Sequence, residues 1–104
     1  MKAHDGNDYE LRRAIERLHG GTATIAQSVP VRETFQGQVV WEGVVHVFDL
    51  AGHPTATRAY AWPFPAEGSD ELRIVAVLHT ERINSPLEAV RAAIVAEHRA
   101  KADR

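Results

Sequence analysis

The side chains best suited to chemistry gather in one segment, HVFDLAGHP, which covers residues 46–54. His46, Asp49 and His53 are residue types that bind metal ions. His46 and Asp49 differ in parity, however, so on an extended strand they point to opposite faces. We therefore predict no metal site and no cofactor here. Asp49 and His53 are expected instead to bond the backbone groups of a tight turn.

Three polar side chains are candidates for a binding or catalytic role, namely His46, His79 and Glu81. An imidazole titrates near neutrality, so it can act as a general base beside a carboxylate. His46 is expected near Gln27 on the buried side of its strand, where a hydrogen-bonded core histidine is the simpler interpretation. His79 and Glu81 share parity and would line a pocket rim or face solvent. A histidine-dependent enzyme is thus the least supported function, and no catalytic residue is assigned.

The familiar catalytic motifs are missing from the sequence. It contains no G-x-S-x-G elbow, no phosphate-cradling G-x-x-x-x-G-K-[ST] loop and no H-E-x-x-H pair. Cysteine is absent, which excludes disulfides, thiol nucleophiles and cysteine-bound zinc. Arg12, Arg13 and Arg17 form a basic stripe that Glu10 and Glu16 interrupt, which indicates a solvated helix face. With a net charge of -2, we expect no nucleic-acid partner.

The composition is that of one globular domain spanning residues 1–104. Hydrophobic residues make up 44% and charged residues 25%, and a chain of this size removes roughly 60–70% of its unfolded surface from water. The polar start has no signal-peptide core, and no apolar run reaches membrane-spanning length. We expect no membrane association, and a cytoplasmic location and a bacterial source are our default assumptions.

The hydrophobic spacing predicts a helix at each end of the chain. After a flexible tail over residues 1–6, the first helix covers 7–19, with Asn7 and Glu10 as a capping box. Gly20-Gly21 ends it. The second helix begins at Pro86, because Ser85 can cap it and Glu88 can close the box.

Between the helices the apolar period changes from helical spacing to two, which indicates β-strands. Gln36-Gly37 and Gly52-His53 are the predicted turns. The predicted class is α+β, with an antiparallel β-meander between the two helices. Its strands are expected at residues 22–35, 38–50, 55–62 and 72–82.

Both faces of the predicted sheet are apolar. Because side chains alternate along a strand, the residues of each face can be assigned. Face one, the expected helix-covered core, carries Ile25, Val29, Val31, Val40, Val44, His46, Phe48, Leu50, Ala59, Ala61, Val75 and Val77. Face two carries Trp41, Val45, Val47, Tyr60, Trp62, Ile74 and Leu78.

Face two is larger than the apolar patch that a monomer usually exposes, so something should cover it. We predict a non-enzymatic interaction module that homodimerises through this face, since two-fold dimers are the commonest assembly. The alternative is a pocket for a small apolar or planar cationic ligand, which tryptophan and tyrosine rings suit. One helix on each face would bury both faces and remove the need for a partner.

Overall fold

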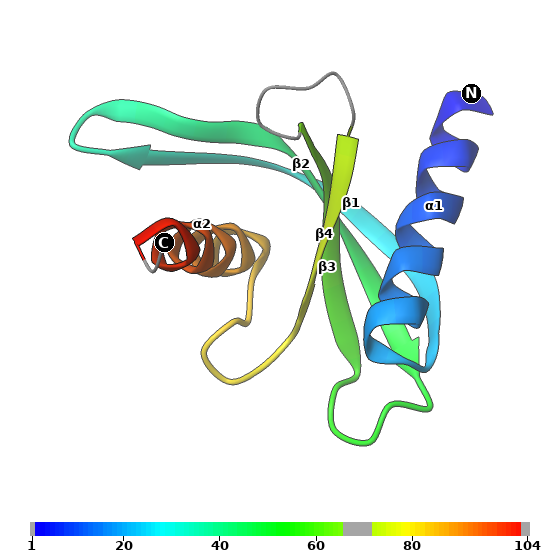
Figure 1. The fold of residues 1–104 in the computed structure, drawn as a ribbon. Helices are drawn as coiled ribbons and strands as arrows, with labels where there is room; N and C mark the ends of the chain where they lie inside the picture. Colours follow the sequence, from blue (N-terminus) through cyan, green and yellow to red (C-terminus); the bar gives the residue numbers. More distant parts are fainter. Residues whose placement is uncertain (1, 66–71, 103–104) are drawn as a thin grey trace.

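The computed structural model describes residues 2–65 and 72–102 as an α+β fold (Figure 1). Two helices flank one antiparallel sheet with the strand order β1-β2-β3-β4. The predicted class, element order and meander are therefore confirmed. The elements are α1 (Lys2–His19), β1 (Thr22–Phe35), β2 (Gln38–Ala51), β3 (Arg58–Pro65), β4 (Leu72–Leu78) and α2 (Pro86–Ala102).

α1 begins at Lys2, whereas the sequence predicts a tail over residues 1–6 and a helix over 7–19. The backbone continues as helix through Asn7, which consequently does not cap it. The helix ends where predicted, because Gly21 has a φ of 80°. A Cβ atom at Gly21 would also lie 2.7 Å from the carbonyl oxygen of Ala51, so only glycine fits there.

β1 and β2 form a long hairpin that turns at Gln36 and Gly37, as predicted. Both turn residues have positive φ, 53° and 81°, which matches the twist of the flanking strands. The register shifts by one residue near Trp41 and shifts back near Ala26. Between the two β-bulges, each residue of β1 therefore faces the side of the sheet opposite to the one that strict alternation from Thr22 would give it.

The second connection is longer than the predicted two-residue turn. β3 begins at Arg58, and the Nδ1 atom of His53 accepts hydrogen bonds from the backbone N–H groups of Thr55 and Ala56. Val47 therefore pairs with Tyr60, whereas a two-residue turn at Gly52-His53 would pair it with Arg58. Because the shift is two residues, each side chain keeps its face of the sheet. β4 ends at Leu78, before the predicted end at residue 82.

The two helices lie on opposite faces of the sheet (Figure 1). α1 packs against one face and α2 against the other, so the expectation that face two would stay uncovered is wrong. The α1-side core consists of Leu11, Ile15, Ala23, Phe48, Leu50, Ala56, Ala59 and Ala61. The α2-side core consists of Val31, Val45, Val47, Tyr60, Trp62, Ala89 and Val90.

Several strand residues occupy the face opposite to the predicted one. Val75 pairs with Trp62 and Val77 with Tyr60, so both valines join the α2-side core. Ile74 and Leu78 consequently pack against the α1-side core. Val29 and Val31 also lie on the α2 side, because the bulge at Ala26 reverses the alternation of β1.

Candidate functional site

The predicted interface residues of face two are divided by the structure. Tyr60 and Trp62 are 1% and 2% exposed under α2, while Ile74 and Leu78 lie on the other face. Val45 and Val47 are equally buried. Trp41 alone among the aromatic residues of this group is half-buried, and its ring meets that of Trp62 edge-on with centroids 5.9 Å apart.

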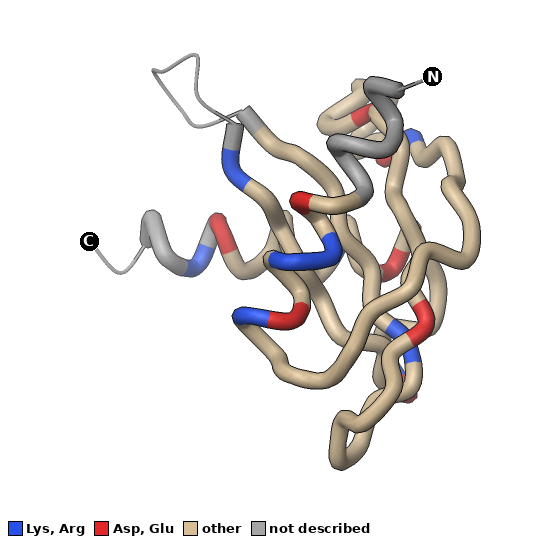
Figure 2. The backbone as a smooth tube through the Cα atoms, turned by 90° about the vertical axis from the view of Figure 1, so that its right-hand side faces the viewer, with Lys and Arg blue, Asp and Glu red and all other residues tan. Residues whose placement is uncertain are grey.

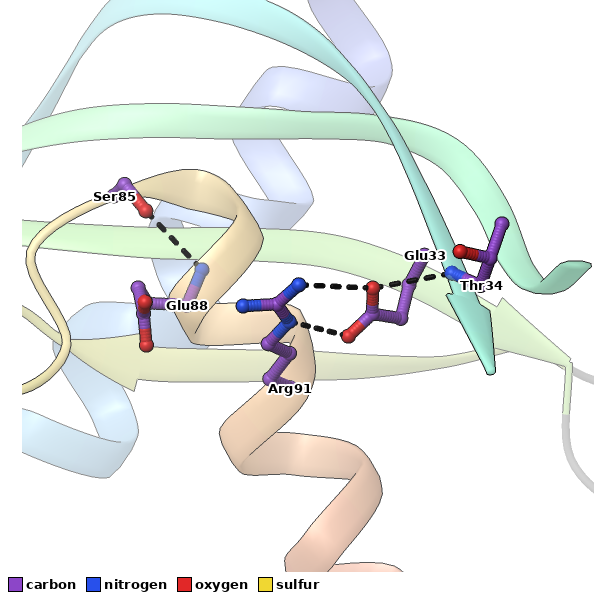
Figure 3. A network of polar contacts seen from close by, with 5 residues as sticks. All are labelled: Glu33, Thr34, Ser85, Glu88 and Arg91. Atoms are coloured by element: carbon purple, nitrogen blue, oxygen red, sulfur yellow. Dashed lines mark hydrogen bonds and ion pairs between the residues drawn. The ribbon is translucent and has the colours of Figure 1, made fainter. Parts of the chain in front are cut away.

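α2 is positioned over this face by a strong helix start. Ser85 accepts a hydrogen bond from the backbone N–H of Glu88 at 3.2 Å, and Pro86 occupies the first helical position, as the sequence predicts. This cap is drawn in Figure 3. Ala89 and Val90 then become buried against the sheet. A capped helix therefore occupies the surface that the sequence analysis reserves for a partner.

Of the polar candidates, His46 forms the pair that most resembles a catalytic arrangement. Its Nδ1 atom shares a hydrogen bond of 2.8 Å with the Ser28 hydroxyl across the β1–β2 ladder. A serine beside an imidazole is part of a nucleophilic site, but nucleophilic catalysis also needs donors for the oxyanion. His46 is only 8% exposed, and no buried polar side-chain atom of the described residues lacks a hydrogen bond. A structural histidine accounts for these facts.

His79 pairs with the hydroxyl of Tyr60 rather than with Glu81. The Tyr60 oxygen and the His79 Nδ1 atom lie 2.7 Å apart. Burial raises the pKa of the Tyr60 hydroxyl above its ordinary value, and nearby Arg58 partly opposes this effect. Tyr60 consequently stays neutral at physiological pH. Glu81 is exposed in the following loop, where its carbonyl oxygen accepts a hydrogen bond from Asn84.

The residues that could bind a metal do not converge. Within residues 2–65 and 72–102, no three histidine, aspartate or glutamate side chains are grouped as ligands. His53 directs its Nδ1 atom at the backbone of its own turn, and Asp49 is exposed. Acidic and basic positions are interspersed along the described backbone (Figure 2).

The most exposed apolar surface lies at the far end of the β1–β2 hairpin. We call residues 29–45 the arm, because β2 pairs with β3 only from His46 onward. The arm projects beyond β3 and β4 and over α2 (Figure 1). Its exposed apolar side chains are Phe35 at 66%, Val39 at 52%, Val40 at 49% and Val44 at 44%. The sequence analysis places Val40 and Val44 in the buried face one, which is wrong.

Two prolines explain why the sheet divides at the base of the arm. The His79 N–H donates to the carbonyl oxygen of Arg58, so the even-numbered residues of β3 direct their backbone groups at β4. Pro63 and Pro65 therefore face β2, and neither has an N–H to donate. Pairing between β2 and β3 accordingly ends at His46 and Ala61. This signal is present in the sequence.

An ion pair ties the arm to α2. Arg91 of α2 binds the Glu33 carboxylate of β1 through two nitrogen atoms, with nitrogen–oxygen distances of 2.5 and 3.4 Å (Figure 3). The same carboxylate accepts a hydrogen bond from the Thr34 backbone N–H. The hydrogen bond from Arg91 holds the pKa of Glu33 below its ordinary value.

Comparison with known proteins adds no identification. The sequence matches no protein-family model and no curated protein, and the fold matches no solved structure. No helix of the described residues is long and apolar enough to cross a membrane. The function must accordingly be argued from the arm and from the helix-covered faces.

Proposed function

We propose that this protein is a small non-enzymatic interaction module that forms a homodimer through the arm. The observation that carries the proposal is the concentration of exposed apolar side chains there. Among the residues whose exposure is described, four of the eight large exposed hydrophobic residues lie in the ten-residue stretch 35–44. A concentration of exposed apolar side chains is typical of interaction sites.

The burial of Tyr60 and Trp62 moves the proposed contact away from face two. Two helices already cover the four-stranded part of the sheet, so a partner gains little area there. The arm remains free of both helices on the side of Val44, whereas half-buried Trp41 lies on the opposite side and packs against the α2-side core. A second copy supplies a matching surface under two-fold symmetry.

The oligomeric state tests this proposal. We expect sedimentation velocity and light scattering to report a dimer whose fraction rises with concentration. The Val44→Glu variant should shift the protein to the monomer, because a carboxylate would be brought into an apolar contact. Val95→Glu is the matched control, since Val95 is 50% exposed on α2 and lies outside the arm.

Two results would overturn the proposal. One is a wild-type protein that stays monomeric at all concentrations. The other is a dimer that Val44→Glu and Val95→Glu weaken equally, which would place the contact elsewhere. Circular dichroism of each variant shows whether the fold is retained, so loss of dimer can be separated from unfolding.

A second candidate function is the binding of a small apolar or planar cationic ligand beside Trp41. It is favoured by the half-buried Trp41 ring and its contact with Trp62, because indole faces attract both apolar groups and cations. A tetraalkylammonium salt should then quench tryptophan fluorescence saturably and raise the melting temperature with concentration. The effect should vanish in Trp41→Ala, and its persistence there would exclude this site.

A further inference from the structure

The backbone of β2 has an unpaired stretch at the base of the arm. The Leu50 N–H donates to the Thr57 carbonyl oxygen, so even-numbered residues of β2 direct their backbone groups away from β1. Glu42 and Val44 are even-numbered too, and no register shift interrupts β2 between them and Leu50, so their backbone groups also point away from β1. Beyond His46, however, β3 no longer pairs with β2. Among the described residues 2–65 and 72–102, no strand pairs with this side of β2 at Glu42 and Val44, so their N–H and carbonyl groups lie at an open strand edge.

The geometry points to edge-to-edge pairing of two copies: β2 of one chain adds antiparallel to β2 of a second chain, with the two-fold axis at Gly43. This inference rests on the proposed homodimer and specifies how its arms meet. The result is a continuous arm of four strands in the order β1, β2, partner β2, partner β1. Main-chain hydrogen bonds would provide the contact, as in other β-augmentation complexes.

The other strand edges are less suited to pairing. In this part of β1, Val29 and Val31 direct their backbone groups at β2. The backbone groups of Pro30 therefore point outward, away from β2. A proline on an outer edge offers no donor to an added strand. At the opposite edge of the sheet, the His19 ring bonds the carbonyl oxygen of Ala76 in β4. The stretch of β2 at Glu42 and Val44 has neither protection.

The unpaired backbone groups of Glu42 and Val44 determine which residues of the two chains lie opposite each other. With Gly43 on the axis, Glu42 lies opposite the partner's Val44 in both halves of the contact, and each pair exchanges two N–H···O bonds. Moving the axis to Glu42 would place two carboxylates directly opposite each other, which is unfavourable. Moving it to Val44 would place Glu42 opposite the partner's His46, whose backbone groups already pair with β3.

The side chains are compatible with this register. The Glu42 carboxylate lies 3.2 Å from the guanidinium of Arg32 in its own chain, so its charge is compensated before association. Its new neighbour is the aliphatic side chain of Val44, which is 44% exposed. At the axis the Trp41 ring lies over Gly43, where an added Cβ atom would come within 2.9 Å of it. Gly43 itself therefore contributes no side chain to the pair of residues at the axis.

Disulfide trapping tests the register directly, because the natural chain has no cysteine. Residues opposite each other in a hydrogen-bonded pair stand about 5.5 Å apart at Cα, within disulfide reach. We expect a mixture of Glu42→Cys and Val44→Cys proteins to form a disulfide-linked heterodimer under mild oxidation. Each variant alone should give none, since its two thiols are then diagonal neighbours too far apart to bridge.

Removal of the outward donor provides an independent test. Val44→Pro deletes only the N–H that faces the open edge, and Pro30 already occupies the position opposite it in β1. We expect the dimer dissociation constant to rise at least about tenfold, because two symmetry-related hydrogen bonds are lost. Ile25→Pro is the control: Ile25 lies opposite Phe48 outside the arm, and its N–H points away from β2, so the dimer should persist.

The outcomes distinguish this inference from the proposed function. A dimer in which Glu42→Cys or Val44→Cys crosslinks to itself, or in which Val44→Pro has no effect, overturns the register while the homodimer stands. A wild-type monomer overturns both. Should Val44→Pro fail to fold, the crosslinking of the mixed cysteine variants still decides the register.

Discussion

The two faces of the sheet are covered by helices of similar length but packed in different ways. On the α1 side, the strands contribute small side chains such as Ala59 and Ala61, and Leu11 and Ile15 of the helix are at most 2% exposed. On the α2 side, the strands contribute Trp62 and other large rings and valines. There α2 fully buries only Ala89 and Val90 among its own residues whose exposure is described.

This difference reflects the size of the strand side chains on each face. The arm has α2 over the side of Val31 and Val45 and leaves its other side, with Val44, exposed. Small side chains such as Ala59 and Ala61 leave room for the side chains of α1, while Phe48 and Leu50 fill the rest of that face. A face of rings and valines is broader, and much of its edge, including Trp41 and Phe64, remains half-buried around α2. The α2 side also uses an ion pair, Arg91 with Glu33, to hold helix and arm together.

The largest expected effect is on the α2 side, at Trp62. The Trp62→Ala variant removes a ring that is 2% exposed, and we expect the free energy of unfolding to fall by about 3–5 kcal/mol. Urea denaturation followed by circular dichroism measures this. A loss below about 1 kcal/mol would mean that α2 does not seal this face in solution. Trp62→Phe keeps most of the ring volume and should lose less.

A second substitution probes the α1 side. Ile15 is 0% exposed, so Ile15→Ala should lower the free energy of unfolding by about 2–5 kcal/mol. Leu18→Ala, one turn along the same helix, is the matched control and should change it by no more than about 0.5 kcal/mol, because Leu18 is 63% exposed. Equal losses for the two variants would contradict the assigned buried stripe of α1.

The small, fully buried side chains beneath α1 predict sensitivity to added volume. Ala59 is completely buried, and we expect Ala59→Leu to destabilise the protein by about 1–3 kcal/mol through overpacking. Thermal denaturation and hydrogen exchange of the α1 amides should both report it. If Ala59→Leu were neutral or stabilising, the α1 side would contain unfilled space and the proposed contrast between the faces would fail.

The smallest expected effect concerns the Glu33–Arg91 pair. Because the pKa of Glu33 is lowered in the folded state, its stabilisation is fully present above the unfolded pKa of about 4.3. It is lost as the pH falls through the lower folded pKa. Glu33→Gln should thus be slightly less stable than wild type at pH 7, and the difference should shrink below about pH 4.

Denaturation of both proteins at a series of pH values measures this difference. Glu97→Gln is a useful comparison, because Glu97 lies 3.7 Å from Arg73 in a more exposed pair and should contribute less. A Glu33→Gln protein that matches wild type at every pH would show that Arg91 does not hold the arm.

The amino-acid sequence by itself determined the features that depend on neighbouring residues. Gln36-Gly37 forms the predicted hairpin turn, because the two residues tolerate the positive φ values that the strand twist requires. Ser85 caps α2 as predicted, because the donor it satisfies lies three residues away. The energies of such turns and caps depend on residues close together in the sequence and not on the rest of the fold.

Only the tertiary structure decided the faces. β4 is apolar at successive positions, so its own sequence cannot tell whether Ile74 or Val75 faces α2, and pairing with β3 makes that choice. The bulge at Ala26 likewise turns Val29 and Val31 toward α2. The site follows the same division: Tyr60 and Trp62 were correctly grouped on one face, but α2 buries them. Which helix covers which face depends on packing between distant segments, and that packing left the arm exposed.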